Sequence, residues 1–399
     1  MKKYSWQHPV MLLILMSVAM PVAFSTWTVL LNNFVVERAA FTGVEIGILQ
    51  SLREIPGFLA FTTIFVSLIL REQTLVVAAL AVVGLGVALT GFFPFEYGLY
   101  CTTLLMSVGF HYFEAVKQSL ALQWLSRDEA PRVFGKLISV GAVTSLLVYG
   151  AIWILLEILA IDYIWIFVLA GGVCFLMALF MWLGFPHFKS SSKQHTHLVL
   201  RKRYWLYYGL IFLSGARRQI FMVFAAFLMV ERFGYSAAQV TLLFLINYIF
   251  NWIFAERIGI LIGKVGERTA LSLEYIGLFL VFTGYAFVEN AYLAAGLYVI
   301  DHMFFALAIA VNTYFQKIAD QADMASSAGV SFTINHIAAV IIPVLLGLIW
   351  IYSHAFVFLI GSGFAICSLL LAQNIPDKPA PGNEVNWGYR SAPVTSGEI

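Results

Sequence analysis

The chain has 399 residues, of which 61% are hydrophobic and 11% are charged, with a formal net charge of +2 and a mean hydropathy of +0.88. Soluble domains carry about 25% charged residues, so this composition excludes an ordinary aqueous enzyme or binding protein. In a membrane protein the position of each charge is more informative than the net charge. We expect no nucleic-acid partner.

Apolar runs repeat from one end of the chain to the other. Each is about 20 residues long, the length that a helix needs to cross about 30 Å of hydrocarbon. We therefore predict an all-α integral membrane fold with about twelve transmembrane helices. They lie near residues 10–35, 46–70, 75–94, 98–122, 134–157, 162–185, 204–229, 237–261, 270–288, 291–316, 328–351 and 355–373.

Two polar segments divide this pattern. A basic stretch at 187–203 separates an N-terminal six-helix bundle, residues 1–186, from a C-terminal six-helix bundle, residues 204–373. Residues 374–399 contain Pro376, Pro379, Pro381 and Gly382, and such a composition predicts a disordered tail.

Lysine and arginine fall almost entirely on one side of the predicted membrane. That side holds seventeen of them: Lys2, Lys3, Arg71, Arg127, Arg132, Lys136, Lys189, Lys193, Arg201, Lys202, Arg203, Arg257, Lys264, Arg268, Lys317, Lys378 and Arg390. The other side holds only Arg38 and Arg232. Because cytoplasmic loops carry the excess of basic residues, we expect an inner-membrane protein with both termini and the central loop in the cytoplasm.

The turn between the eighth and ninth spans carries the most specific motif. It runs from Gly259 through Gly263, Lys264 and Gly266 to Arg268, and it resembles the Gly-x-Leu-Ala-Asp-Arg-x-Gly-Arg-Arg signature of the major facilitator superfamily. Gly259 and Gly266 would permit a tight turn, while Lys264 and Arg268 would place charge at the helix ends. Gly263 replaces the usual Asp of this signature.

With the split into two groups of six spans, this resemblance covers nearly the whole chain and implies a secondary transporter. The equivalent turn of the first half, at 67–73, has lost the glycines and most of the pattern. The fifth span also lacks the proline typical of drug antiporters, since 141–150 reads GAVTSLLVYG.

In this superfamily the first, fourth, seventh and tenth helices line the central cavity, and three of these helices carry charges here. Charged side chains at the centre of a membrane span cost about 2.5 to 3.5 kcal/mol each, so these positions are functional candidates. In the fourth span, His111, Glu114 and Lys117 share one helical face. Glu114 and Lys117 could instead neutralise each other as a purely structural pair.

The seventh and tenth spans hold the remaining candidates. Arg217 and Arg218 diverge by about 100° on a helix, so one would face the cavity, with a slight preference for Arg218, and the other would meet a neighbouring helix. In the tenth span, Asp301, which is followed by His302, lies at a membrane depth similar to that of the two arginines. Asp301 would share a helical face with Asn312. An interaction of Asp301 with one of the arginines would either take part in coupling proton binding to transport or serve only as a structural ion pair that stabilises helix packing.

Trp27, in the first span, could stack on a ligand, although membrane tryptophans more often serve packing. Arg53 and Glu54, near the outer third of the second span, are interpreted as reaching back to the interface.

These residues favour a proton-coupled secondary transporter of a small anionic or zwitterionic solute, working by alternating access as a monomer, with sodium as the alternative coupling ion. A multidrug or metabolite efflux antiporter of the same superfamily is the second reading, and a membrane-embedded enzyme the third. We expect no catalytic residues and no cofactor. We also expect no metal site, since Cys101, Cys174 and Cys367 lack metal-ligand spacing.

Overall fold

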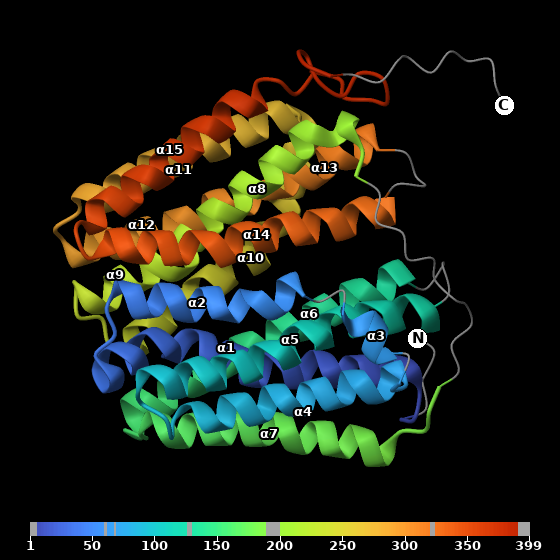
Figure 1. The fold of residues 1–399 in the computed structure, drawn as a ribbon, viewed down its shortest axis with the longest axis vertical. Helices are drawn as coiled ribbons and strands as arrows, with labels where there is room; N and C mark the ends of the chain where they lie inside the picture. The colour runs from blue at the N-terminus through green and yellow to red at the C-terminus, as the bar shows by residue number, and fades with distance from the viewer. Residues whose placement is uncertain are drawn as a thin grey trace. The chain divides into compact units, whose positions relative to one another are not determined.

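A computed structural model describes residues 6–59, 62–67, 69–125, 130–188, 200–319 and 324–389. In these ranges the chain is helical, and the only pairing of extended backbone is an isolated bridge between Ala380 and Asn383. The chain forms two compact units (Figure 1), which are described separately. The N-terminal unit comprises Met1–Gln194 and Gly234–Leu245, and the C-terminal unit comprises His195–Phe233 and Ile246–Ile399.

Glycines allow close helix packing in the N-terminal unit. Its helices are α1 (Pro9–Ala39), α2 (Gly43–Phe58), α3 (Thr63–Ser67), α4 (Glu72–Thr90), α5 (Glu96–Trp124), α6 (Ala130–Trp153), continued by a π-helical turn at Ile154–Ile158, and α7 (Tyr163–Gly184). A Cβ atom at Gly84 of α4 would lie 2.7 Å from the carbonyl oxygen of Gly171 in α7. A Cβ at Gly86 would lie 2.6 Å from the backbone nitrogen of Met106 in α5. These small residues therefore let α5 and α7 approach the α4 backbone, as is common in membrane helix packing.

The C-terminal unit contains α8 to α15, apart from the first residues of α10. Its elements are a 3₁₀ turn at Lys202–Tyr204, α8 (Trp205–Gln219), a π-helical segment at Ile220–Ala225, α9 (Ala226–Glu231), α10 (Ala237–Val265), α11 (Glu267–Phe287), α12 (Ala291–Phe305), a 3₁₀ segment at Ala306–Ala308, α13 (Ile309–Ile318), α14 (Met324–Trp350) and α15 (His354–Ala372). Residues 237–245 of α10 group with the N-terminal unit, and the rest of α10 belongs to the C-terminal unit.

Two of these spans are interrupted part-way along. The predicted seventh span is divided into α8 and α9 by the π-helical segment Ile220–Ala225, and the tenth into α12 and α13 by the 3₁₀ segment Ala306–Ala308. Neither segment contains proline or glycine. Departures from α-helical hydrogen bonding in the middle of a helix often mark a hinge or a functional site.

Each of the twelve predicted spans coincides with a helical region, which confirms the all-helical membrane fold. Among the described residues, nine of these regions are long and apolar enough to cross a membrane. The other three predicted spans correspond to α2 with α3, to α5 and to α10, and α10 contains a shorter apolar stretch, Ala237–Phe250. Polar residues such as Arg53 and Glu54 in α2, and His111, Glu114 and Lys117 in α5, interrupt the apolar character of two of them.

The predicted tail differs from our expectation of disorder. Residues 374–389 fold back on the C-terminal unit, and Asn374, Ile375, Glu384 and Val385 have no exposed surface. Residues 390–399, and residues 189–199 of the predicted central linker, lie outside the described residues.

Candidate functional site

A fully buried ion pair lies inside the C-terminal unit. Nη2 of Arg217, in α8, is 3.5 Å from Oε1 of Glu274, in α11, and both side chains are 0% exposed. The Arg217 guanidinium also lies over the Tyr275 ring, with Cζ 4.3 Å from the ring centroid, and Nη1 donates a hydrogen bond to Ser368 of α15. Arg217 is therefore held from three sides, by a carboxylate, an aromatic face and a hydroxyl.

Asp301 of α12 lies in the same polar region. It is 0% exposed, and neither of its carboxylate oxygens has a hydrogen-bond partner among the described residues. It interacts electrostatically with Arg217 and Glu274. The tyrosines Tyr285 and Tyr298, both buried, interact electrostatically with Asp301 in turn.

Arg217, Glu274 and Asp301 form what we call the buried charge cluster. If all three side chains were ionised, the cluster would carry two negative charges and one positive charge. A buried charge without a partner is strongly unfavourable, and buried charged groups are normally paired or neutralised. With all three groups ionised, one negative charge of the cluster would remain uncompensated.

Glu274 is a member of this cluster that was not predicted as a site residue, because the ninth helix of the superfamily usually supports the cavity rather than lining it. The pairing also differs from the expected Asp301 to arginine contact, since the ion pair of Arg217 is with Glu274.

The two arginines of α8 have different surroundings. Arg217 has no exposed surface, whereas Arg218 is exposed. The two arginines therefore differ, as expected from their divergence on the helix. Arg217 contacts neighbouring helices of its own unit, and Arg218 has exposed surface.

The other tenth-span candidates do not share one environment. His302 is partly buried, with its ring centroid 6.1 Å from that of Phe221, and Asn312 is exposed. Asp301 and Asn312, which were expected on one face, differ in exposure, and the 3₁₀ segment Ala306–Ala308 lies between them.

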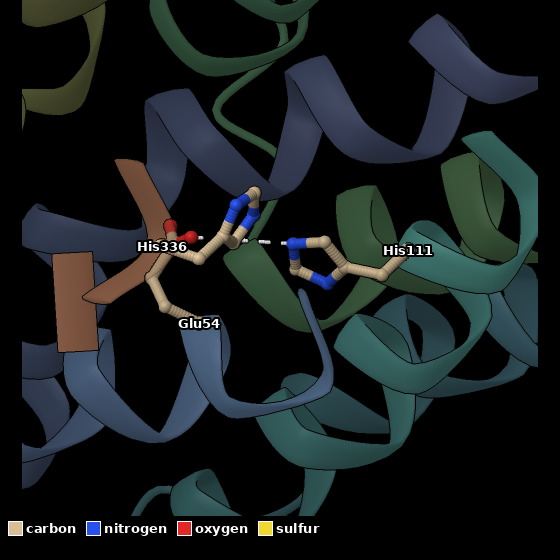
Figure 2. Close-up of side chains that lie close together, drawn as sticks. All are labelled: Glu54, His111 and His336. Atoms are coloured by element: carbon tan, nitrogen blue, oxygen red, sulfur yellow. Dashed lines mark ion pairs between the residues drawn. The ribbon is translucent and has the colours of Figure 1, made fainter. Parts of the chain in front are cut away.

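The N-terminal unit has a polar cluster of its own, between α2 and α5. Nη2 of Arg53 pairs with the adjacent Glu54 carboxylate, and Nε donates to Oε1 of Gln50 at 2.7 Å. Nε2 of His111 lies 4.0 Å from Oε2 of Glu54, and Figure 2 shows these two side chains joined by that contact. Ser107 donates a hydrogen bond to the carbonyl oxygen of Arg53.

Glu54 and His111 are each only 3% exposed. The interpretation of Arg53 and Glu54 as reaching the interface is therefore wrong. Both belong to a packed polar contact with α5, which their position near the end of an apolar run did not indicate.

The remaining candidates of this unit are less enclosed or serve packing. Glu114 is exposed, and Lys117, which is partly buried, has Nζ 5.2 Å from the Phe113 ring centroid. The described residues include no ion pair between them, and the burial of His111 shows that the three do not share one environment. Trp27 is 1% exposed and packs beside Phe24, with ring centroids 6.3 Å apart, so it lies in the core.

In the motif between the eighth and ninth spans, one glycine has the expected conformation. Gly266 alone separates α10 from α11 and has a φ of +80°, which favours glycine. Gly259 lies within α10 and makes no turn, so its expected role is wrong. Lys264 lies in the last turn of α10, and Arg268 in the first turn of α11 pairs with Asp377.

The sequence profile of the Major Facilitator Superfamily matches residues 12–343. The chain belongs to this superfamily. Among curated protein sequences none matches it. As a superfamily member with these apolar helices, it is a multi-pass membrane transporter.

Solved structures of transporters have the same fold. Crystal structures of the nucleoside transporter NupG, as an aspartate-to-alanine mutant and in its unmutated form, are similar with TM-scores of 0.76 and 0.73. Both are 15% identical in sequence and cover 92% of this chain, and the matches cover 99% and 98% of those chains. An inward-facing, occupied structure of a bacterial homologue of the lysosomal transporter Spinster has a TM-score of 0.67 and 12% identity, covering 91% of this chain and 95% of that chain. At these identities the likeness concerns the fold.

Proposed function

We propose that this transporter moves a small anionic or zwitterionic solute by alternating access, and that proton binding at the buried charge cluster is coupled to that movement. The observation that carries the proposal is the charge count of the cluster: two unexposed carboxylates, Glu274 and Asp301, for one unexposed guanidinium, Arg217. Intramembrane ionisable residues of this kind are typical of proton pathways in transporters.

Asp301 is the carboxylate best suited to exchange the proton. Glu274 lies within ion-pair distance of Arg217, so its negative charge is compensated when ionised. Asp301 has no hydrogen-bond donor among the described residues, so its neutral acid form suits the surroundings seen here. Release of its proton requires water or a cation to reach it, and a change in access to the cluster would therefore be linked to proton transfer.

Arg218 supports the choice of an anionic or zwitterionic solute. Arg217 has no exposed surface, whereas Arg218 is exposed, so Arg218 is the arginine of α8 with surface that a solute could contact. Guanidinium groups bind carboxylates and phosphates through paired hydrogen bonds.

The proposal includes the topology and setting of the protein. The distribution of lysine and arginine supports an inner-membrane location with both termini in the cytoplasm. We propose that a single chain in the lipid bilayer is the functional unit.

Uptake by purified protein in proteoliposomes tests the proposal. The solute panel would contain anions, zwitterions and, because NupG has a similar fold, nucleosides, each offered with an imposed pH gradient or an imposed sodium gradient. We expect the pH gradient to drive accumulation of at least one solute. In Asp301→Asn, accumulation of that solute should be lost, while its exchange at equal pH continues.

The matched control is Glu289→Gln, which removes an exposed carboxylate from the connection between α11 and α12. It should retain pH-driven accumulation. Accumulation that persists in Asp301→Asn would contradict the proposed role of this carboxylate, and accumulation driven by sodium alone would contradict proton coupling.

A further inference from the structure

The segment that follows α15 is a packed part of the C-terminal unit. We call residues 374–389 the C-terminal strap; in Figure 1 it is the red segment beyond α15. Ile375 and Val385, both 0% exposed, join a core cluster that includes Tyr314, Phe315 and Ile318 of α13. The strap therefore contributes side chains to the interior of the unit and is more than a surface tail.

Hydrogen bonds centred on Asn374 close the strap into a loop. The Nδ2 atom of Asn374 donates to the carbonyl oxygen of Trp387 at 2.9 Å, and the Trp387 amide donates back to Oδ1 at 2.7 Å. The backbone N–H of Asn386 donates to the backbone carbonyl oxygen of Asn374 at 2.8 Å. Because Asn374 itself is 0% exposed, these bonds fix the two ends of the loop together in a protected position.

The strap also contacts three helices. The Tyr314 hydroxyl of α13 donates to the carbonyl oxygen of Glu384 at 2.6 Å. Arg268 of α11 pairs with Asp377, and the ring of Trp205 at the start of α8 lies 6.0 Å from that of Trp387. Of these contacts, only the bond from Tyr314 joins a fully buried side chain to the strap backbone.

The helix held by this bond is separated from its neighbour along the chain. α13 has ten residues and is joined to α12, which carries Asp301, through the 3₁₀ segment Ala306–Ala308. A 3₁₀ segment has poorer hydrogen-bond geometry than an α-helix, so the junction between α12 and α13 is weaker than a continuous α-helix would be. α13 therefore depends on its packing partners more than a continuous helix would.

We propose that the C-terminal strap is a clamp on α13. By holding α13 against the core through Tyr314, Ile375 and Val385, it restricts bending of the tenth span to the segment at Ala306–Ala308. α12, with Asp301, is then able to change position while α13 stays fixed. Release of the strap would let α13 move as well and would remove this division of the span.

Hydrogen–deuterium exchange of the full chain in nanodiscs, followed by mass spectrometry, tests the clamp. Tyr314→Phe removes the hydroxyl and keeps the ring. We expect amide exchange in α13 to become roughly fivefold faster, the factor that corresponds to one lost hydrogen bond, while exchange in α12 and α15 is unchanged. Tyr292→Phe, at an 86% exposed tyrosine in the first turn of α12, is the matched control. It should leave amide exchange in both α12 and α13 unchanged.

A pair of truncations gives a second, larger perturbation. Ending the chain after Gln373 removes the strap, whereas ending it after Tyr389 removes only residues beyond the strap. The first should accelerate exchange in α13 more than Tyr314→Phe does, and the second should have no effect. Equal acceleration in α8, α11, α13 and α15 would overturn the clamp and assign the strap to general packing, and unchanged exchange in α13 would overturn it outright. Because the measurement involves no solute and no coupling ion, its failure leaves the proposed transport function untouched.

Discussion

The Arg217 guanidinium lies 3.5 Å from the Glu274 carboxylate, and neither side chain is exposed. This relationship separates the two arginines of α8 by role. Arg217 is part of the interior of the C-terminal unit, linking α8 to α11 and, through Ser368, to α15. It also leaves Asp301 as the carboxylate of the buried charge cluster that has no ion pair within 4.0 Å among the described residues.

The first prediction concerns the stability of this pair. Arg217→Gln leaves Glu274 without its partner, and Glu274→Gln leaves Arg217 without its own. Removal of one member of a buried ion pair costs about 3–5 kcal/mol, so each single change should lower the thermal unfolding temperature in detergent and the amount of folded protein in membranes.

The double variant, Arg217→Gln with Glu274→Gln, provides the control. It contains no uncompensated charge when Asp301 is in its neutral acid form, so it should be more stable than either single variant. If the effects of the two single changes simply add, the side chains do not stabilise each other and the pair contributes nothing as a pair.

The second prediction concerns Gly266, whose backbone has φ +80° and ψ 160°. This conformation is open essentially to glycine alone, and other residues pay about 1–3 kcal/mol for such strain. Gly266→Ala should therefore lower the unfolding temperature, although a Cβ atom there meets nothing within 4 Å.

Gly259→Ala is its matched control, because a Cβ atom at Gly259 also meets nothing within 4 Å but the residue lies inside α10. Alanine in a helix is favoured over glycine by about 0.5–1 kcal/mol, so this variant should be at least as stable as the parent. Equal effects of the two substitutions would show that the backbone conformation of Gly266 is unimportant.

Hydropathy was sufficient to predict the helices, because a membrane requires long apolar segments with all backbone hydrogen bonds made internally. It could not predict where the seventh and tenth spans change helical type. Ala306–Ala308 and Ile220–Ala225 contain no proline or glycine, so only tertiary packing distinguishes them from ordinary helix.

Prediction of the site residues was limited in a similar way, because the sequence does not show how the helices pack. Span depth identified Arg217 and Asp301 as candidates, but their partners depend on how helices pack, which the spacing of residues along one helix does not show. For that reason the sequence did not show that Glu274 pairs with Arg217, or that Glu54 contacts His111. The strap was predicted to be disordered from Pro376, Pro379 and Pro381, and the signal that pointed the other way was the apolar pair Ile375 and Val385 with the nearby Trp387.

The third prediction concerns topology. Asn290 precedes α12 and Lys378 lies in the strap, and both are exposed. Because three spans, the tenth, eleventh and twelfth, separate these positions, the predicted topology places Asn290 outside and Lys378 in the cytoplasm. Cysteines introduced singly at these two positions, after replacement of Cys101, Cys174 and Cys367, should react differently with a membrane-impermeant thiol reagent.

In intact cells, Asn290→Cys should be labelled and Lys378→Cys should be labelled only after the membrane is opened. Labelling of both positions in intact cells would contradict the assignment of spans between them. The opposite pattern would invert the orientation while leaving the span count in place.

The fourth prediction concerns solute binding by Arg218. If the exposed guanidinium binds an anionic group of the solute, Arg218→Ala removes a charge-assisted hydrogen bond, which is worth about 1.5–3 kcal/mol. The half-saturating solute concentration for exchange at equal pH should then rise by roughly ten- to 150-fold, while the amount of folded protein stays the same because Arg218 is not buried. Arg218→Lys keeps the charge but lacks the planar fork, so it should restore binding only in part. Gln316→Ala, at an exposed polar residue of α13 that is not a candidate, is the control and should leave the half-saturating concentration unchanged. An unchanged half-saturating concentration in Arg218→Ala would rule out this arginine as the solute's partner, and a parallel loss of folded protein would assign it a structural role instead.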